Sequence, residues 1–204
     1  MKESARLSVL SGVRRGRESS WSTFYDIYYQ YLRDVCIGRG ISWGGQIMDV
    51  SWHDAEDIVQ ELMAKVHKED KIEKYDKQRG AKFRTYLCML LKDRMKSYGR
   101  RRYKVLDQEL SDKDIEKRVD SMMQGFDKYT SEVWASKVEK LSKEMLRENV
   151  DPLTYQIFDS LVEEKKTVSE VADFFDVSKN NIYQIKDRTK KMLGKYINQI
   201  SEEL

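Results

Sequence analysis

The sequences DAEDIVQELMAKVHK at residues 54–68 and FRTYLCMLLKDRMKSYGRRRYK at residues 83–104 decide the fold of this chain. A short segment with one glycine, KYDKQRGAK at residues 74–82, separates them. In both stretches apolar residues recur at intervals of three and four. This spacing predicts two amphipathic helices, each with a single buried stripe.

The two predicted helices carry opposite charges outside their apolar stripes. The first begins with acidic residues, which suit the dipole of a helix N-terminus. Residues 82–104 contain nine Lys or Arg and one Asp, a local charge of +8. We therefore expect the two helices to pack through their apolar stripes and to present an acidic face and a basic face to solvent.

Composition predicts an all-α protein made of small domains. The chain has 204 residues, of which one is proline, ten are glycine and 36% are charged. Its net charge of +3 hides a strong asymmetry, because residues 82–104 and 179–195 together carry +13 and the remainder carries −10. Two separated basic segments favour an extended polyanion that the protein contacts at two places.

The periodicity divides the chain into four parts. Residues 1–20 are predicted to be a loose N-terminal segment, 21–104 a first helical domain, 105–130 a flexible linker, and 131–204 a second helical domain. The first domain starts with a helix at about residues 22–37, whose tyrosines fit either core packing or base stacking; helical spacing favours the core. Residues 38–50 form a glycine-rich loop of unassigned role.

Cysteine and histidine usage gives no sign of a metal or cofactor site. Cys36 and Cys88 lie within helical patterns and are interpreted as buried thiols of a reducing compartment. His53 and His67 are distant from any cysteine cluster, so surface positions are favoured over metal ligation. The sequence contains no signal peptide and no apolar run of the ~20 residues needed to span a membrane, so we expect a cytoplasmic protein.

The C-terminal segment has the pattern of a helix-turn-helix. Asp151-Pro152 marks a helix start, and Thr167 with Glu170 forms a predicted capping box. A three-residue turn at 176–178 precedes a second helix that is polar and basic at its start. Such a helix can enter the DNA major groove, where Asn and Gln pair with adenine and Lys with guanine. A plain helical hairpin with a solvated basic face is the alternative.

Both motifs resemble known sequences. DAEDIVQELM followed by FRTYLCMLLKDRMKSYGRRR resembles region 2 of the sigma-70 family of bacterial transcription initiation factors. The segment TVSEVADFFDVSKNNIYQIKDRTKKML resembles region 4 of the same family. A short linker between the two regions is similar to the compact extracytoplasmic-function group. The resemblance implies a non-enzymatic sigma factor that binds core RNA polymerase, recognises promoters and assists DNA melting.

The resemblance also implies site residues and partners. Asp57, Gln60 and Glu61 would dock on the β′ clamp of core polymerase, and the β flap and an anti-sigma factor are further candidate partners. The loop at 76–82 would help to capture a base extruded from the promoter −10 element. Residues expected to contact the −10 element are Lys77, Gln78, Arg79, Lys82, Arg84, Lys92, Lys96, Arg100, Arg101 and Arg102. Residues expected to read the −35 element are Lys179, Asn180, Asn181, Tyr183, Gln184 and Arg188.

Two residues depart from the family pattern. Asp93 stands where the basic helix often has Asn, and its carboxylate would repel phosphate unless it is paired. Asp176 occupies a turn position where Gly is usual, and that position often requires a positive φ, which Asp tolerates better than most residues.

Two other functions fit parts of the sequence. A stand-alone helix-turn-helix regulator would bind operator DNA without polymerase, but it has no need of the acidic helix. A metal-dependent nuclease could use the carboxylates of the acidic helix, which are Asp54, Glu56, Asp57 and Glu61. One helix rarely builds a two-metal site alone, and the sequence offers no second acid cluster or catalytic histidine.

Overall fold

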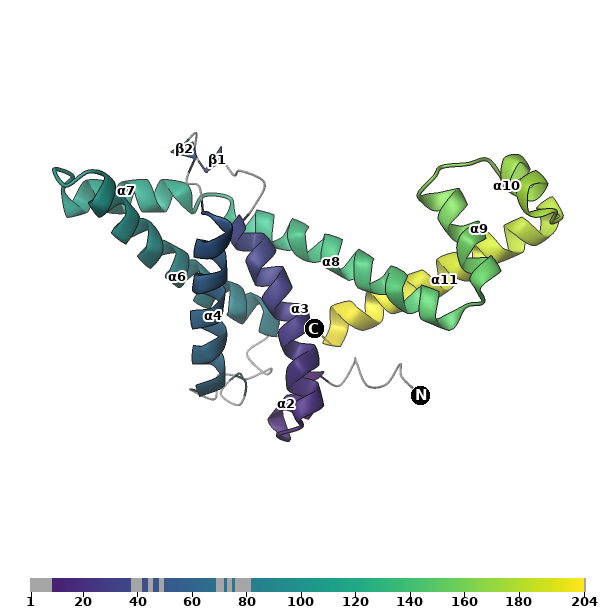
Figure 1. Ribbon diagram of the computed structural model, residues 1–204, viewed down its shortest axis with the longest axis horizontal. Helices are drawn as coiled ribbons and strands as arrows, with labels where there is room; N and C mark the ends of the chain where they lie inside the picture. The colour runs from purple at the N-terminus through teal and green to yellow at the C-terminus, as the bar shows by residue number, and fades with distance from the viewer. Residues whose placement is uncertain are drawn as a thin grey trace. The chain divides into compact units, whose positions relative to one another are not determined.

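The fold is all-α, as predicted, in the residues that the computed structural model describes. These residues are 9–37, 42–43, 46–47, 50–68, 72, 75 and 82–203. The helices are α2 (Val9–Arg14), α3 (Glu18–Ile37), α4 (Trp52–Lys68), α6 (Phe83–Leu106), α7 (Asp112–Met122), α8 (Phe126–Asn149), α9 (Pro152–Val162), α10 (Val168–Phe175) and α11 (Lys179–Glu203) (Figure 1). One antiparallel pair joins β1 (Ser42–Trp43) and β2 (Gln46–Ile47).

The chain forms two compact units, Met1–Ala135 and Ser136–Glu203, and α8 crosses the boundary between them. In the first unit α4 packs against both α3 and α6. The buried residues of α4 are those of the predicted stripe, from Ala55 to Val66. On α6 the apolar stripe is buried at Phe83, Leu87, Leu91 and Met95. It is only partly buried at Tyr86, Leu90, Arg94 and Tyr98.

Aromatic residues of α3 build the core of the first unit. Tyr28 and Tyr31 are fully buried, which confirms core packing for these two tyrosines. The Tyr31 hydroxyl donates to the Thr130 carbonyl at 3.0 Å and lies 3.1 Å from the Cys88 sulfur. The Tyr31 ring also meets the Trp134 ring edge-on, at 5.0 Å between centroids. The first turns of α8 therefore belong to the same core as α3 and α6.

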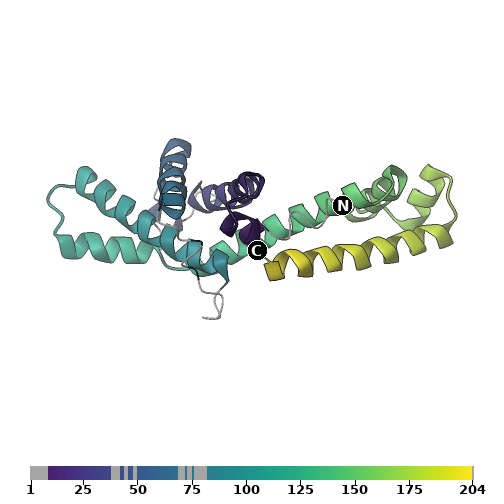
Figure 2. The ribbon, with the colours of Figure 1, turned by 90° about the horizontal axis from the view of Figure 1, so that it is seen from below.

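Residues 105–130 differ from the predicted linker. They contain α7, which follows a reversal of the chain after α6, and the start of α8 (Figures 1 and 2). Ile115, Val119 and Met122 form a buried stripe on α7. Gly99 of α6 admits this close approach, because a Cβ there would lie 3.1 Å from Met122 Cε. A short helix rich in charges is stable here because it packs against α6, which local sequence does not reveal.

The N-terminal segment also differs from the loose chain predicted at 1–20. Val9 and Val13 lie one turn apart on α2 and are buried, and α3 begins at Glu18, earlier than expected. Gly12 lies so close to α3 that a Cβ would overlap the Ser20 side chain. Gly16 turns the chain between the helices with φ of 69°. Two apolar residues spaced by four were too weak a signal to predict α2.

The second unit has a small core of its own. Ile157 of α9, Val171 and Ala172 of α10 and Ile182 of α11 are buried together. The Asp151 side chain accepts a hydrogen bond from the Thr154 amide at 2.9 Å, and Pro152 occupies the first turn of α9, as the sequence predicted. Lys143 of α8 contacts Glu163 at 2.6 Å, which ties α8 to the end of α9.

Candidate nucleic-acid interface

The start of α4 is fixed by a reciprocal cap. The Asp54 amide donates to Ser51 Oγ at 3.1 Å, and the Ser51 amide and hydroxyl donate to Asp54 Oδ2 at 3.3 and 2.6 Å. Hydrogen bonds from Ser51 lower the pKa of the Asp54 carboxyl. Asp54 therefore has a structural task as the partner of the helix cap.

The three residues predicted to dock on polymerase share the exposed face of α4. Asp57, Gln60 and Glu61 are all exposed, and their spacing of three and four places them on one side of the helix. Ile58, on the buried stripe, faces α6. Glu61 also contacts Arg94 of α6 at 3.4 Å, and both side chains remain in part accessible to solvent. The α4 surface therefore offers two carboxylates and one amide to a partner.

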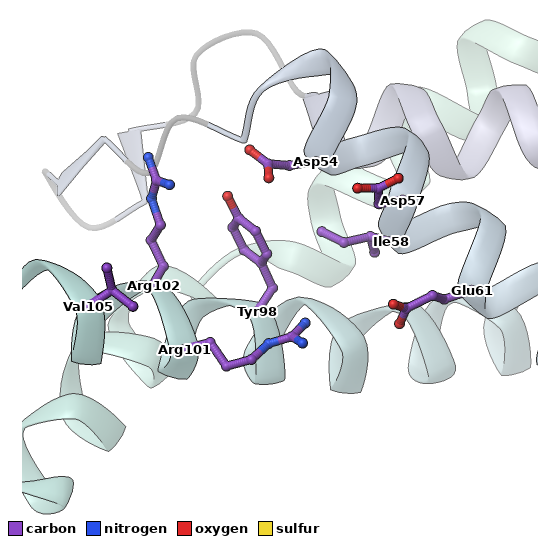
Figure 3. A pocket seen from close by; sticks show the side chains of 8 residues that line it. All are labelled: Asp54, Asp57, Ile58, Glu61, Tyr98, Arg101, Arg102 and Val105. Carbon is purple, nitrogen blue, oxygen red and sulfur yellow. The ribbon is translucent and has the colours of Figure 1, made fainter.

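A groove of about 330 Å³ separates the acidic face of α4 from the basic end of α6. Its lining residues are Asp54, Asp57, Ile58, Glu61, Tyr98, Arg101, Arg102 and Val105 (Figure 3). In Figure 3 the Tyr98 hydroxyl points toward the Asp54 carboxylate. Partial burial and that carboxylate raise the pKa of Tyr98 to about 12, so the phenol stays protonated at neutral pH. The groove thus brings acids of one helix next to arginines of the other.

Some of the residues predicted to contact the −10 element are exposed, and others have partners within the chain. Arg101 and Arg102 are exposed at the groove, and Lys82 is exposed just before the helix. Arg84 is half-buried, and its guanidinium lies over the Trp134 ring at 5.4 Å, a contact with the core of the unit. Lys77, Gln78 and Arg79 lie outside the described residues, as does the rest of the predicted base-capture loop before Lys82.

The remaining predicted −10 residues carry intramolecular ion pairs. Lys92 lies 3.4 Å from Asp127, and Lys96 lies 2.7 Å from Asp120. Arg100 binds Glu116 through two hydrogen bonds of 2.7 Å. All three acids belong to α7 or to the first turn of α8.

Sequence reasoning missed the partners Glu116, Asp120 and Asp127. They fall in the segment that was interpreted as a linker, so no partner for α6 was sought there. A usable signal was present, because Ile115, Val119 and Met122 have the spacing of one helical face. Glu116 and Asp120 each come directly after a residue of that stripe. They are four positions apart, so they lie on one side of the helix.

The segment predicted to form a helix-turn-helix has the expected caps and turn. Thr167 and Glu170 form a reciprocal capping box at the start of α10. Asp176 ends α10 with φ of 52° and ψ of 47°, the left-handed conformation anticipated for this position. The Asn181 amide donates to Ser178 Oγ at 3.3 Å, so Ser178 caps α11. The side chains of the first turn of α11, at residues 179–181, are exposed.

The predicted −35 residues are exposed on the N-terminal half of α11. Tyr183 is more than half exposed, whereas the neighbouring Ile182 is buried in the core of the unit. Arg188 differs from the others, because its guanidinium donates to Thr154 Oγ1 at 3.2 Å and lies 4.0 Å from Asp151. Arg188 therefore links α11 to the capped start of α9 in addition to being accessible.

The described residues also show the state of the cysteines and the distribution of metal-ligating and apolar side chains. Cys36 and Cys88 are free, buried thiols, as predicted. Within the described ranges, no group of three or more His, Cys, Asp or Glu side chains has the arrangement of a metal site. No helix in the described part of the chain combines the length and apolarity needed to cross a membrane.

Comparison with known families places the α4–α6 pair in context. Residues 48–105 match the family described as sigma-70 region 2, a span that contains α4 and nearly all of α6. The match covers 58 of the 204 residues. It supports a sigma-70 family sigma factor, with a role in RNA polymerase binding and promoter recognition. No curated protein sequence matches the chain.

Proposed function

We propose that this chain is a sigma factor that binds bacterial core RNA polymerase, directs it to promoters and assists DNA melting. The observation that carries the proposal is the sigma-70 region 2 match over an acidic helix packed on a basic one. In this proposal the polymerase performs the chemistry, and the chain supplies recognition and binding energy without acting as an enzyme.

The exposed face of α4 is the proposed docking surface for the β′ clamp. Asp57, Gln60 and Glu61 together offer acceptors for an arginine-bearing partner helix, and charge-assisted hydrogen bonds are among the stronger contacts of this kind. Because Glu61 already contacts Arg94 at 3.4 Å, a partner arginine would replace or share that contact.

The proposed contacts to DNA come from both units. Arg101 and Arg102 would meet phosphates near the −10 element, and exposed residues of α11 would read the −35 element in the major groove. The exposed first turn of α11 and its serine cap support this assignment to the second unit. Contact of this unit with the β flap, membership of the extracytoplasmic-function group and control by an anti-sigma factor are parts of the same proposal.

The proposal is tested by mixing the purified chain with bacterial core polymerase and separating the complex by size-exclusion chromatography. Run-off transcription from genomic fragments then follows. The expected result is co-migration together with transcripts that core polymerase alone does not produce. DNA binding by the chain without polymerase binding would contradict the proposal and favour a stand-alone helix-turn-helix regulator.

A further inference from the structure

Three cations on one side of α6 are matched by three acids of the next two helices. Lys92 contacts Asp127, Lys96 contacts Asp120, and Arg100 contacts Glu116. We refer to Glu116, Asp120 and Asp127 as the acidic cover. The cover comes from α7 and the first turn of α8, which follow α6 in the chain (Figures 1 and 2).

The position of the acidic cover is set by apolar packing. Ile115, Val119 and Met122 of α7 are buried, and Gly99 of α6 lies against Met122 and Val119. Phe126, beside Asp127, is buried as well. The ion pairs are thus an addition to a helix contact that holds without them, and they can change partners while α7 stays in place.

The cover is accessible to solvent and to competing ions. The exposed fraction of the side chain is 45% for Glu116, 60% for Asp120 and 84% for Asp127. Ion pairs this exposed are weak and are screened by salt. A polyanion can therefore compete for the same cations at moderate cost.

The cover carboxylates lie within ion-pair distance of cations that could otherwise bind a phosphate. Arg100 directs Nε and Nη2 at the two oxygens of Glu116, a two-point geometry that arginine also uses toward phosphate. A phosphate must displace Glu116 before it can bind this edge of the guanidinium. The ammonium groups of Lys92 and Lys96 lie 3.4 Å from Asp127 and 2.7 Å from Asp120, so a carboxylate partly neutralises each charge.

We propose that Glu116, Asp120 and Asp127 are specificity-determining residues that substitute for DNA phosphates on α6 and thereby weaken binding to DNA of arbitrary sequence. The inference rests on the proposed function in taking α6 as a DNA-facing helix. Non-specific binding depends almost wholly on phosphate contacts, so it loses most when three cations are occupied. A promoter complex also has the base contacts of α11 and the contacts of the polymerase with DNA. It therefore loses a smaller share of its binding free energy.

The test compares the triple variant E116Q/D120N/D127N with the control E109Q/D112N/E132Q. Both sets remove three negative charges from exposed residues of the same unit, but the control acids have no ion pair with α6 among the described residues. The probe is a short fluorescent DNA duplex of arbitrary sequence, and anisotropy gives its Kd at several salt concentrations.

The cover variant is expected to bind this duplex at least tenfold more tightly than the control at low salt. The slope of log K against log salt should steepen by about 0.9 for each released cation, or nearly 3 in total. Equal affinity and equal slope for the two variants would overturn the proposal. Hydrogen exchange of the α7 amides in both variants verifies that α7 stays packed.

A double-mutant cycle keeps the proposal testable even if the triple variant folds poorly. R100Q is measured in the wild-type chain and in E116Q. The proposal expects a small loss of duplex affinity in the first background and a loss severalfold larger in the second. Equal losses would show that Glu116 does not occupy Arg100 and would overturn the proposal.

The two proposals fail in different measurements. The sigma-factor proposal fails if the wild-type chain does not bind core polymerase. The cover proposal fails if the cover and control variants bind the arbitrary duplex equally. The cover variants are expected to bind core polymerase like the wild-type chain, because the substituted residues lie outside the exposed α4 face.

Discussion

Arg100 of α6 and Glu116 of α7 form a two-point ion pair, with Nε donating to Oε2 and Nη2 donating to Oε1, each at 2.7 Å. The pair joins α6, which carries most of the proposed DNA contacts, to α7. The sequence pattern predicted a linker in place of α7. The consequence of the pair is that part of the basic charge of α6 is already neutralised within the chain. Salt, pH and DNA should all act on this pair.

The Arg100–Glu116 pair should be visible in the titration of one carboxyl group. Hydrogen bonds from Arg100 lower the pKa of Glu116. The stabilising contribution of the pair is therefore complete above the pKa of the unfolded chain and is lost as the pH falls through the folded pKa. In the variant R100Q, NMR titration should find the Glu116 pKa higher than in the wild-type chain, because the hydrogen bonds from Arg100 are lost. An unchanged pKa would contradict the pairing.

The capping box of α10 should contribute measurably to the second unit. Replacing Thr167 with Ala removes the acceptor of the Glu170 amide, which lies 3.3 Å from Thr167 Oγ1. A lost cap of this type costs about 1 kcal/mol of unfolding free energy. Urea unfolding followed by the Ile182 methyl signal measures the change. Ser169→Ala, at an exposed position in the same first turn, should change stability by much less.

Substitutions of Asp176, the left-handed residue after α10, should change the stability of the second unit in different directions. Asp176 has φ of 52°, where glycine has no steric penalty. Asp176→Gly should keep or raise the stability of the second unit. Asp176→Val should lower it by about 1–2 kcal/mol, because a β-branched residue tolerates the left-handed conformation less well than Asp does. The same urea experiment checks both variants. Equal stability of the two would contradict the assigned turn geometry.

Phosphate and base contacts should separate by their dependence on DNA sequence. Arg101→Ala should weaken all promoters by a similar factor and reduce the salt slope by about 1, because it removes one phosphate contact. Tyr183→Ala and Gln184→Ala should instead alter the preferred −35 sequence. Binding to a library of promoter duplexes, followed by sequencing, measures both effects. A changed base preference in Arg101→Ala would place that residue at a base edge.

Much of the local structure was predictable, because it depends on short-range spacing. The apolar stripe of α4, the capping box at Thr167 and Glu170 and the helix start at Asp151 were all predicted from residues within one or two turns. The same is true of Asp176, whose positive φ follows from its place after α10. Each of these features is decided by hydrogen bonds and sterics within a few residues.

The features that were not predicted depend on contacts between distant residues. Ion pairing of Lys96 with Asp120 needs the chain to reverse between α6 and α7, and Gly99 must admit Met122 for that to happen. The contact of the Arg84 guanidinium with the Trp134 ring likewise joins two residues that are 50 positions apart in the chain. The number of charged residues in a helix does not show which of its cations have an ion-pair partner within the chain.

The exposed α4 face is the central element of the account, and charge reversal tests it most directly. The variant Gln60→Lys/Glu61→Lys should lose binding to core polymerase by at least a hundredfold while the chain remains folded. The matched control is Gln108→Lys/Glu109→Lys, since the same dipeptide recurs there at exposed positions between α6 and α7. The control should bind core polymerase like the wild-type chain. Wild-type affinity in the α4 variant would contradict the account.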